Sequence, residues 1–411
     1  MMLRIKDYTT KVGSGVTPRG GAETYLDEGI PLFRSQNVTN DGFLMDDIAF
    51  ISEEVDESMK GTRVKPGDVL LNITGASIGR CFYTPDDFER GNVNQHVCII
   101  RPKKNKVKPD YLHYCIISDK GQQQIDLTQT GANREGLAVE DIKGFMFDIP
   151  SLPVQQRIVD YLNKKLTKID ERIEVLEKQK DAYMRLKKSI IHQAVTRGLK
   201  PNVSLKDSGI EWIGMIPEHW EVKRFKSIFS ECKSVTETGQ EDLLSVSEYY
   251  GIARRIDKMD DGEYESRADS LIGYKICKKD DLVINIMLAW KRGLGFSDFD
   301  GIVSPAYAVY RGKNIVPHYF HYLMRTDMYV AEYKRNSKGI IDSRLRMYTD
   351  RFNNIIAIVP PLSEQEAIAS YLDEKCAKID AAIENISKQI DASKRLKRAL
   401  INEVITGQRA V

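Results

Sequence analysis

The sequence predicts an α+β protein in which two globular α/β domains are separated by two long helices that form an antiparallel coiled coil. Two observations predict this architecture. The helical segments at 150–196 and 360–406 align without a gap and are identical at 21 of 47 positions. The segments that precede them alternate β-branched and aromatic residues with turn residues, a pattern typical of short strands. The chain is therefore an internal duplication of two units, with a pseudo-two-fold repeat.

Length and composition favour more than one folded domain. The chain has 411 residues, of which 42% are hydrophobic and 29% charged. The longest apolar run, NNIIAIVPPL, is shorter than the roughly 20 residues that a membrane-spanning helix needs, and no signal peptide is visible. Six scattered cysteines without a CxxC pair indicate neither a zinc site nor disulfides, so we expect a soluble protein of the cytoplasm.

We place the domain boundaries where the sequence pattern changes. A first globular domain covers 1–150 and a first spacer helix 151–198. A second globular domain covers 199–360 and a second spacer helix 361–411. The segment 199–220, punctuated by Gly and Pro, is the linker into the second domain, and the first domain has no counterpart of it.

Both helical segments carry apolar residues at heptad spacing, which is typical of a coiled coil. In the first helix these residues are Ile169, Ile173, Leu176, Tyr183, Leu186 and Ile190. In the second they are Ile379, Ile383, Ile386, Ile390, Leu396 and Leu400. Because the two stripes are so similar, we expect the helices to bury them against each other, although each helix could instead pack on its own domain.

Signals for helix ends accompany both segments. Pro153 occupies a first-turn position, and Ser363 with Glu366 forms the S-x-x-E pattern of a capping box. Gly198 and Gly407 follow the last residues of the two helices, where helix-ending glycines belong. Each segment therefore has the start and stop signals of one continuous helix.

The charge of the chain does not by itself indicate a nucleic-acid-binding protein, because the formal net charge is only +2. The distribution is uneven. Residues 1–150 carry 18 Lys and Arg against 22 Asp and Glu, residues 151–200 carry 12 against 6, and residues 301–350 carry 8 against 4. A polyanion would therefore meet local basic patches, which can also be no more than solvated helix faces.

Several ordered motifs resemble those of the DNA-specificity subunits of type I restriction–modification systems. They are WIGMIPEHWEVKRFKSIF at 212–229, NIMLAWKRGLGFSDFDGIVSPAYAVYRG at 285–312, and the helix openings IPSLPVQQRIVDYL and IVPPLSEQEAIASYL. The resemblance covers essentially the whole chain, and it implies two target-recognition domains that each read one half of a split, asymmetric DNA sequence. The segment PSLPVQQ departs from the PPLxEQ that the family usually has, which affects the helix cap.

The resemblance also implies partners. The helices would dock two methyltransferase subunits, which restriction and translocase subunits then join, and S-adenosylmethionine and ATP are expected on those partners. The chain itself shows no NPPY-like motif, no GxxxxGK[ST] phosphate loop and no convincing nuclease motif, so we expect no catalytic residues and no cofactor. We also expect no metal site, because His318 and His321 are better explained by a helix packed through Tyr319, Phe320 and Leu323.

Four loops offer side chains of the types that read bases and bind phosphates. The first domain supplies Arg34, Ser35, Gln36 and Asn37 in one loop, and Asn133 and Arg134 in another. The second domain supplies Trp290, Lys291 and Arg292, and then Lys338, Ser343, Arg344 and Arg346. A structural role stays open for any single residue, but given the resemblance we favour DNA contact for the four loops together.

The length of the helices leads to a further hypothesis. Residues 167–196 would span about 45 Å at 1.5 Å per residue, and one DNA turn is about 34–36 Å, so such helices could place half-site centres about one turn apart. Two other functions stay open at this point. The chain could be a coiled-coil scaffold without a DNA role, or a DNA-binding regulator without a methyltransferase partner, although no helix-turn-helix pattern stands out.

Overall fold

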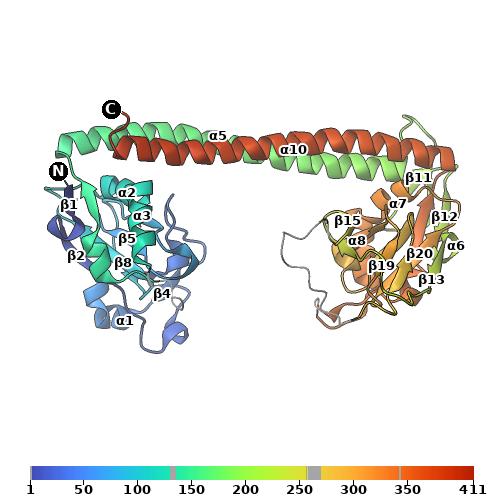
Figure 1. Cartoon of the computed structure of the whole chain (residues 1–411), viewed down its shortest axis with the longest axis horizontal. Coiled ribbons are helices and arrows are strands. Elements are labelled where there is room, and N and C mark those ends of the chain that lie inside the picture. Colours follow the sequence, from blue (N-terminus) through green and yellow to red (C-terminus); the bar gives the residue numbers. More distant parts are fainter. Residues whose placement is uncertain (1, 130–135, 256, 258–269, 342–343) are drawn as a thin grey trace. The chain divides into compact units, whose positions relative to one another are not determined.

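The computed structural model describes residues 2–129, 136–255, 257, 270–341 and 344–411, and the structural statements below concern these residues. The chain forms two compact units. Unit 1 comprises Met1–Glu177 with Ser387–Val411, and unit 2 comprises Lys178–Ile386. Each unit contains one globular domain and a part of both long helices, which are α5 (Leu152–Arg197) and α10 (Leu362–Ile405) (Figure 1). Among the described residues, no helix is both long and apolar enough to cross a membrane.

Unit 1 is built around a four-stranded antiparallel sheet with the strand order β2-β8-β5-β6. The strands of this sheet are β2 (Thr9–Ser14), β8 (Val97–Pro102), β5 (Val69–Asn72) and β6 (Cys81–Tyr83). Smaller pairings join β1 (Met2–Arg4) to β9 (Met146–Asp148), and β3 (Ile30–Phe33) to β4 (Ala49–Ile51) and β7 (Asn92–Val93). The short helices are α1 (Glu53–Ser58), α2 (Pro109–Ile117), α3 (Asp119–Thr128) and α4 (Val139–Gly144).

Unit 2 contains the corresponding sheet, with the strand order β13-β20-β17-β18. Its strands are β13 (Phe229–Cys232), β20 (Tyr307–Gly312), β17 (Asp281–Asn285) and β18 (Leu294–Phe296). Two-stranded pairings join β10 (Leu205–Asp207) to β11 (Met215–Pro217), β12 (Glu221–Arg224) to β21 (Ile356–Val359), β14 (Leu244–Ser247) to β15 (Gly251–Arg254), and β16 (Lys275–Cys277) to β19 (Gly301–Val303). The short helices are α6 (Phe225–Ile228), α7 (Pro317–Met324), α8 (Asp327–Asn336) and α9 (Thr349–Phe352).

The two units repeat one plan, which confirms the predicted duplication and the α+β class. The same ion pair closes both sheets. In unit 1 the guanidinium of Arg101 lies 2.7 Å from the carboxylate of Asp68, and in unit 2 Arg311 lies 2.9 Å from Asp281. Both aspartates are buried, and a buried carboxylate is unfavourable without a cationic partner, so the arginine at the end of β8 and β20 is needed in both units.

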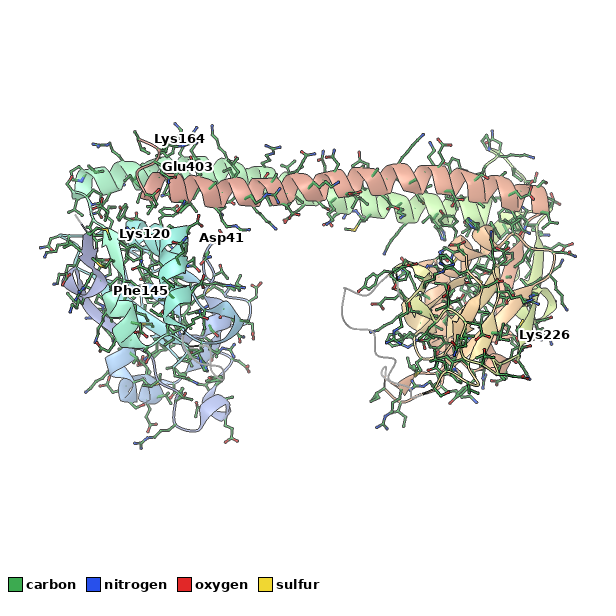
Figure 2. All side chains as sticks on the ribbon, in the orientation of Figure 1. Asp41, Lys120, Phe145, Lys164, Lys226 and Glu403 are labelled. Carbon is green, nitrogen blue, oxygen red and sulfur yellow. The ribbon has the colours of Figure 1, made fainter. Side chains whose placement is uncertain are left out.

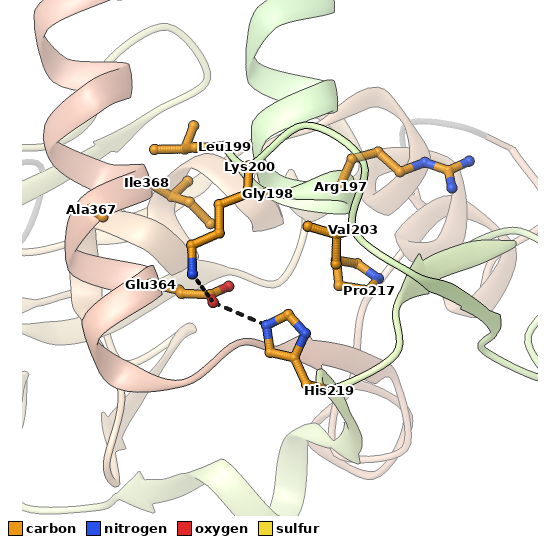
Figure 3. A pocket seen from close by; sticks show the side chains of 10 residues that line it. All are labelled: Arg197, Gly198, Leu199, Lys200, Val203, Pro217, His219, Glu364, Ala367 and Ile368. Atoms are coloured by element: carbon orange, nitrogen blue, oxygen red, sulfur yellow. Dashed lines mark hydrogen bonds and ion pairs between the residues drawn. The ribbon is translucent and has the colours of Figure 1, made fainter.

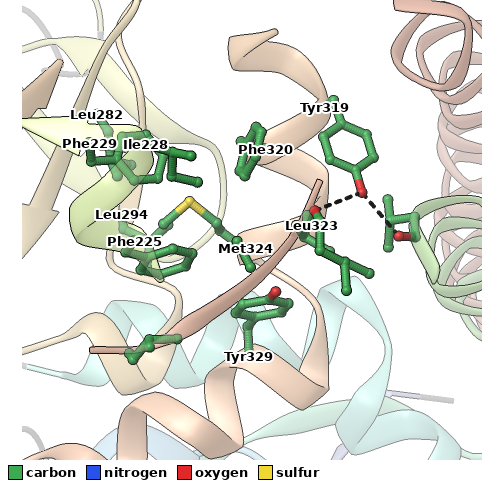
Figure 4. Close-up of a cluster of buried hydrophobic side chains, with 14 of the residues drawn as sticks. Phe225, Ile228, Phe229, Leu282, Leu294, Tyr319, Phe320, Leu323, Met324 and Tyr329 are labelled. Carbon is green, nitrogen blue, oxygen red and sulfur yellow. Dashed lines mark hydrogen bonds between the residues drawn. The ribbon is translucent and has the colours of Figure 1, made fainter. Parts of the chain in front are cut away.

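Each globular domain includes the ends of the long helices in its hydrophobic core. In unit 1, Phe145 (Figure 2) packs in a cluster with Leu162 of α5 and Leu400 of α10. In unit 2, the cluster around Phe225 includes Val195 of α5. Figure 4 shows how Tyr319 of α7 joins this cluster to α5 within unit 2: its hydroxyl donates to the carbonyl oxygen of Val195 at 3.1 Å. The helix ends are thus fixed to their globular domains by burial of apolar surface.

The helices α5 and α10 run antiparallel in each unit, and the coiled coil is confirmed with one correction. Equivalent positions of the two helices are buried or half-buried along one stripe. They are Ile169, Ile173, Leu176, Lys180, Tyr183, Lys187, Ile190 and Ala194 in α5, and Ile379, Ile383, Ile386, Ile390, Ser393, Lys397, Leu400 and Val404 in α10. The prediction that Leu186 and Leu396 belong to this stripe is wrong, because they are 47% and 54% exposed. Each lies about 100° around the helix from the stripe lysine that follows it.

Both long helices begin against a buried glutamine. The side-chain oxygen of Gln155 accepts from the backbone amide of Lys108, and its amide donates to the carbonyls of Lys106 and Pro150. Gln365 makes the matching bonds to the amide of Val316 and the carbonyl of Pro360. Both side chains are at most 1% exposed. This explains why the duplicated segments share a glutamine at this position.

The predicted capping box at Ser363 and Glu366 is wrong. The helix α10 begins at Leu362, so Ser363 already lies in its first turn, and the carbonyl of Pro361 accepts the backbone amides of Glu364 and Gln365. Pro153, by contrast, lies in the first turn of α5 as predicted.

The linker 199–220, which leads into the second globular domain, packs where α5 ends and α10 begins (Figure 3). Glu364 of α10 accepts hydrogen bonds from the ring nitrogens of Trp220 (2.9 Å) and His219 (3.0 Å). Burial raises the pKa of the Glu364 carboxyl, but these hydrogen bonds outweigh it and lower the pKa overall. Gly198 ends α5 with a φ of +76°, and a Cβ there would lie 3.3 Å from the buried Trp220 ring. The linker therefore fixes both helix ends.

Candidate nucleic-acid interface

Candidate side chains in the two units lie beside the ends of two corresponding strands, β5 in unit 1 and β17 in unit 2. Strand β5 ends at Asn72 and β17 ends at Asn285, and both asparagines are buried. Each is followed by a one-turn helix, η5 (Gly75–Ser77) in unit 1 and η7 (Ala289–Lys291) in unit 2. The chain then turns back, and the backbone amides of the two asparagines donate to the carbonyls of Arg80 and Gly293, both at 2.8 Å. The predicted Trp290–Arg292 loop is thus the unit 2 version of this turn.

In both units a residue just before the next short helix, α4 or α9, bonds to this strand end. The backbone amide of Leu137 donates to the carbonyl of Ile73 at 2.9 Å, and that of Met347 donates to the carbonyl of Ile286 at 2.8 Å. Leu137 and Met347, which follow the two predicted loops in the sequence, therefore occupy corresponding places. Asn133, Arg134 and Ser343, which we predicted to contact DNA, lie outside the described residues.

In unit 1 the loop Arg34–Asn37 is attached to the same strand end. The side-chain amide of Asn72 donates to the carbonyls of Ser35 (2.8 Å) and Val38 (3.1 Å). Within the loop, Ser35 is half-buried and Gln36 is exposed and bonded to Asp47. The structure therefore attaches the predicted Arg34–Asn37 loop to the end of β5.

Two residues of this loop are used inside the protein. Asn37 is 1% exposed, and its side-chain amide donates to the carbonyls of Leu44 and Asp47. Arg34 is half-buried and donates to the carbonyl of Asp47 at 2.6 Å. A base contact by Asn37 would break its internal hydrogen bonds, so the structure gives this residue a structural role and leaves Gln36 as the exposed amide of the loop.

Sequence reasoning missed a polar group beside this loop. His96 lies between β7 and β8, its Nδ1 lies 2.6 Å from the hydroxyl of Thr74, and its Nε2 lies 2.9 Å from the side-chain amide of Gln95. Gln95 is exposed and can offer its amide to a base edge. The signal in the sequence was the run of three polar residues in VNQHV, which separates two apolar stretches.

In unit 2 the same turn carries an aromatic ring between cations. The ammonium groups of Lys291 and Lys334 lie 5.0 Å and 5.2 Å from the centre of the Trp290 ring, and the Trp290 ring nitrogen donates to the carbonyl of Met287. Lys334 belongs to α8 and was not among the predicted residues. The three side chains form a cationic surface beside the strand end, of a kind that suits phosphate groups.

Arg292 turns away from this surface. Its backbone has a φ of +62°, its Nε donates to the carbonyl of Arg325 at 3.1 Å, and its guanidinium forms an ion pair with Asp327. These contacts give Arg292 a structural role, although it was predicted together with Trp290 and Lys291. Only the tertiary contacts distinguish it from its neighbours.

Lys338, Arg344 and Arg346 lie on a closed hairpin. The backbone groups of Lys338 and Arg346 bond to each other in both directions at 2.9 Å. Lys338 and Arg344 are exposed, whereas Arg346 is half-buried and donates to the carbonyl of Leu345. The hairpin adds cations to the strand end that already carries Trp290 and Lys291.

The matches to known proteins agree with this geometry. Residues 2–182 match the family model described as type I restriction modification DNA specificity domain. The chain is 25% identical over 388 residues to the type I restriction enzyme MjaVIII specificity subunit of Methanocaldococcus jannaschii, covering 89% of this chain and 84% of that protein. It is 20% identical over 431 residues to the StySPI specificity subunit of Salmonella potsdam, covering 98% of this chain and 88% of that protein.

Solved structures show the same fold at low identity. A chain from a structure of assembly and conformational transition in the type I R-M system has a TM-score of 0.71 at 14% identity, covering 98% of this chain and 97% of that one. The HsdS subunit from Thermoanaerobacter tengcongensis has a TM-score of 0.54 at 14% identity, covering 100% and 97%. The chain is thus similar over nearly its whole length to specificity subunits of type I restriction enzymes.

Within the plan that they share, the two units of this chain differ beside the coiled coil. In unit 1 the connection from β3 to β4 covers residues 34–48, and its Asp41 (Figure 2) lies 2.6 Å from Lys397 of α10. In unit 2 the connection from β14 to β15 is only Glu248–Tyr250. The side chain of Tyr249 there lines a cavity of about 870 Å³ that also has Lys187 in its wall.

The side chain of Arg325 holds the β14–β15 turn of unit 2 through hydrogen bonds. Its guanidinium donates to four carbonyl groups, those of Arg292, Leu294, Glu248 and Tyr249. Burial lowers the pKa of Arg325 to about 10, so the side chain stays charged at neutral pH. The short turn is therefore held by one half-buried cation, whereas the long connection of unit 1 is held by the amide of Asn37.

Proposed function

We propose that this chain is the DNA-recognition subunit of a type I restriction–modification complex, in which each globular domain reads one half of a bipartite, asymmetric DNA target. One observation carries the proposal. Candidate side chains lie beside the end of β5 in unit 1 and beside the corresponding end of β17 in unit 2, yet the residues there differ. Two domains of one design can dock on DNA in the same way and still select different bases, because docking depends on phosphate contacts and selection on base edges.

The side chains suit this division of roles. Gln36 and Gln95 in unit 1 are exposed amides, which can form paired hydrogen bonds with adenine. Arg344 in unit 2 is an exposed guanidinium, which can do the same with guanine. Lys291 and Lys338 are exposed ammonium groups that suit phosphates. The two half-sites should therefore have different sequences.

We further propose that the long helices dock two methyltransferase subunits, which restriction and translocase subunits then join. Leu186 and Leu396 support this. They occupy the same position of the repeat, lie outside the coiled-coil stripe and are about half exposed. Each is preceded by an arginine and followed by a lysine. A duplicated apolar residue that the fold does not bury is explained by a partner that binds twice.

Recognition and catalysis would then reside on different chains. S-adenosylmethionine and ATP would bind to the methyltransferase and translocase subunits, because this sequence carries neither an adenine-methyltransferase motif nor a phosphate loop. The contribution of this chain is the choice of sequence.

Methylation sequencing of DNA from cells that contain the complex tests the proposal. Arg344→Ala should relax one base in one half-site, with a loss of about 1–3 kcal/mol of discrimination, and Gln36→Ala should affect only the other half-site. Lys338→Ala should weaken binding to all sequences alike and lower the salt slope by about one. Lys226→Ala removes an exposed cation from α6 as a control and should change neither. The proposal fails if the wild-type complex modifies no defined sequence, or if the motif is one uninterrupted palindrome.

A further inference from the structure

Two consecutive isoleucines, Ile340 and Ile341, project into solvent from the hairpin of unit 2. We call them the apolar tip. Ile340 is 100% exposed and Ile341 is 53% exposed. A single exposed apolar residue needs no explanation, but adjacent β-branched residues at the end of a hairpin form an apolar surface that the fold leaves uncovered.

The position of the apolar tip is defined by the backbone around it. Lys338 and Arg346 close the hairpin with two hydrogen bonds, and the backbone amide of Arg344 donates to the carbonyl of Ile341 at 2.9 Å. Gly339 is required there, because its φ is +155° and a Cβ would lie 2.6 Å from the carbonyl oxygen of Arg344. The exposure of the tip is therefore a consequence of a closed turn.

The base of the hairpin is anchored in the core of unit 2. Leu345 is 7% exposed and Met347 is 1% exposed, and the backbone amide of Met347 bonds to the end of β17 through Ile286. Apolar residues of the same segment are thus buried at its base and exposed at its end. The same segment buries Leu345 and Met347, so the exposure of Ile340 and Ile341 is best explained by a partner that covers them.

The flanks of the apolar tip are cationic. Lys338 precedes it, Arg344 follows it, and both are exposed. Residues 337–348 contain three cations and one acid, Asp342, which lies outside the described residues. An apolar surface between cations matches a base step between its phosphates, whereas an apolar protein surface would not need the cations.

We propose that the apolar tip is a wedge that enters the DNA duplex in the half-site read by unit 2 and unstacks one base step, while Lys338 binds a neighbouring phosphate and Arg344 contacts the edge of an adjacent base. This inference rests on the proposed function. Aliphatic wedges of this kind kink DNA and increase the surface that the protein can contact. The corresponding segment of unit 1, TGANREG at 130–136, has no large apolar residue, so we expect a wedge in one half-site only.

Base stacking in the bound target provides the first test. The full chain, assembled with its methyltransferase subunits, is bound to target duplexes that carry 2-aminopurine at successive positions. We expect the fluorescence to rise at one step of the unit 2 half-site, away from the methylated adenine. The double variant Ile340→Ser/Ile341→Ser should lose this signal and bind the target at least tenfold less tightly. Ile272→Ser changes another exposed isoleucine of unit 2, outside the hairpin, and should retain both properties.

A rescue experiment separates unstacking from simple contact. A duplex with an abasic site or a mismatch at the identified step is already unstacked, so the double serine variant should bind it almost as tightly as the wild-type complex does. The inference is overturned if no step outside the methylated adenine responds, or if the serine variant binds and unstacks like the wild type. If instead the wild-type complex shows no sequence-specific binding, the proposed function itself has failed.

Discussion

Lys187 of α5 donates to both carboxylate oxygens of Asp380 of α10 at 2.6 Å. In unit 1 the same pair recurs with the helices exchanged, because Lys397 of α10 donates to Asp170 of α5 at 2.8 and 3.0 Å. The lysines are 210 positions apart, and so are the aspartates. Each unit thus replaces one apolar contact of the coiled coil by an ion pair, a device that fixes register.

The two lysines should differ in their contribution to stability. Lys397 has Asp41 as a second partner, and its side chain is 19% exposed against 30% for Lys187. Burial lowers the pKa of Lys397, but the hydrogen bonds to Asp170 and Asp41 outweigh it and raise the pKa overall. Because the aspartates are half exposed, the effects are modest: we expect about 1–2 kcal/mol for Lys397→Met and about 0.5–1 kcal/mol for Lys187→Met. Hydrogen exchange of the helix amides in each unit measures both, and equal losses would contradict the role of Asp41.

The buried glutamines should be essential for attaching the helices. Gln155→Ala leaves the backbone groups at Lys106, Lys108 and Pro150 without their partner, so we expect unit 1 to lose about 1–3 kcal/mol of stability. Gln156→Ala is the matched control, because Gln156 is exposed and its side-chain amide donates to Asp160 of the same helix. Urea unfolding followed by hydrogen exchange in unit 1 compares the two variants. Similar stability of both would show that the buried amide is dispensable.

Unit 1 should lose stability in mild acid through His113. Burial lowers the pKa of this residue from 6.5 to about 4, and the side chain is 3% exposed. The unfolded chain then binds a proton that the folded chain excludes, so the stabilisation is present above pH 6.5 and is lost as the pH falls towards 4. We expect a loss of about 2 kcal/mol between pH 7 and pH 5.

A variant without the titrating ring tests this assignment. His113→Phe keeps an aromatic ring next to Phe82 and Tyr114, so it should fold and show a flatter dependence of the unfolding free energy on pH. Calorimetry at several pH values supplies the comparison. A slope as steep as that of the wild type would assign the acid sensitivity to other groups.

The outward leucines should each support one methyltransferase subunit. Leu186→Glu or Leu396→Glu should reduce the number of bound methyltransferase subunits from two to one, and the double variant should bind none, because a carboxylate in an apolar contact is strongly unfavourable. Native mass spectrometry counts the bound subunits. Val175→Glu is the control, since Val175 is 58% exposed but its repeat counterpart is Asn385. Two bound subunits in the double variant would exclude these leucines from the docking surface.

The length of the helices should set the spacing of the target. Deleting one heptad from both α5 and α10, at matching positions of the repeat, removes about 10 Å of helix and keeps the apolar stripe in register. We expect the preferred spacer to shorten by about three base pairs, as read by methylation sequencing. An unchanged spacer would show that the helices do not measure it.

The sequence alone determined the duplication and the long helices. These are properties of local pattern: identity between two segments, heptad spacing and the composition of short strands need no knowledge of distant contacts. It also indicated which loops to examine, because polar and glycine-rich stretches between apolar strands are visible in one dimension.

Only the tertiary structure decided which side chains of those segments serve the interior. Leu186 fits the heptad pattern but faces outward. Lys187 beside it lies in the stripe instead, because its ammonium group pairs with Asp380 of the other helix. Asn37 and Arg292 look like base readers in sequence, yet they bind carbonyl and carboxylate groups of their own units. Such outcomes depend on partners far away along the chain, which burial and hydrogen bonding select only when the chain has folded.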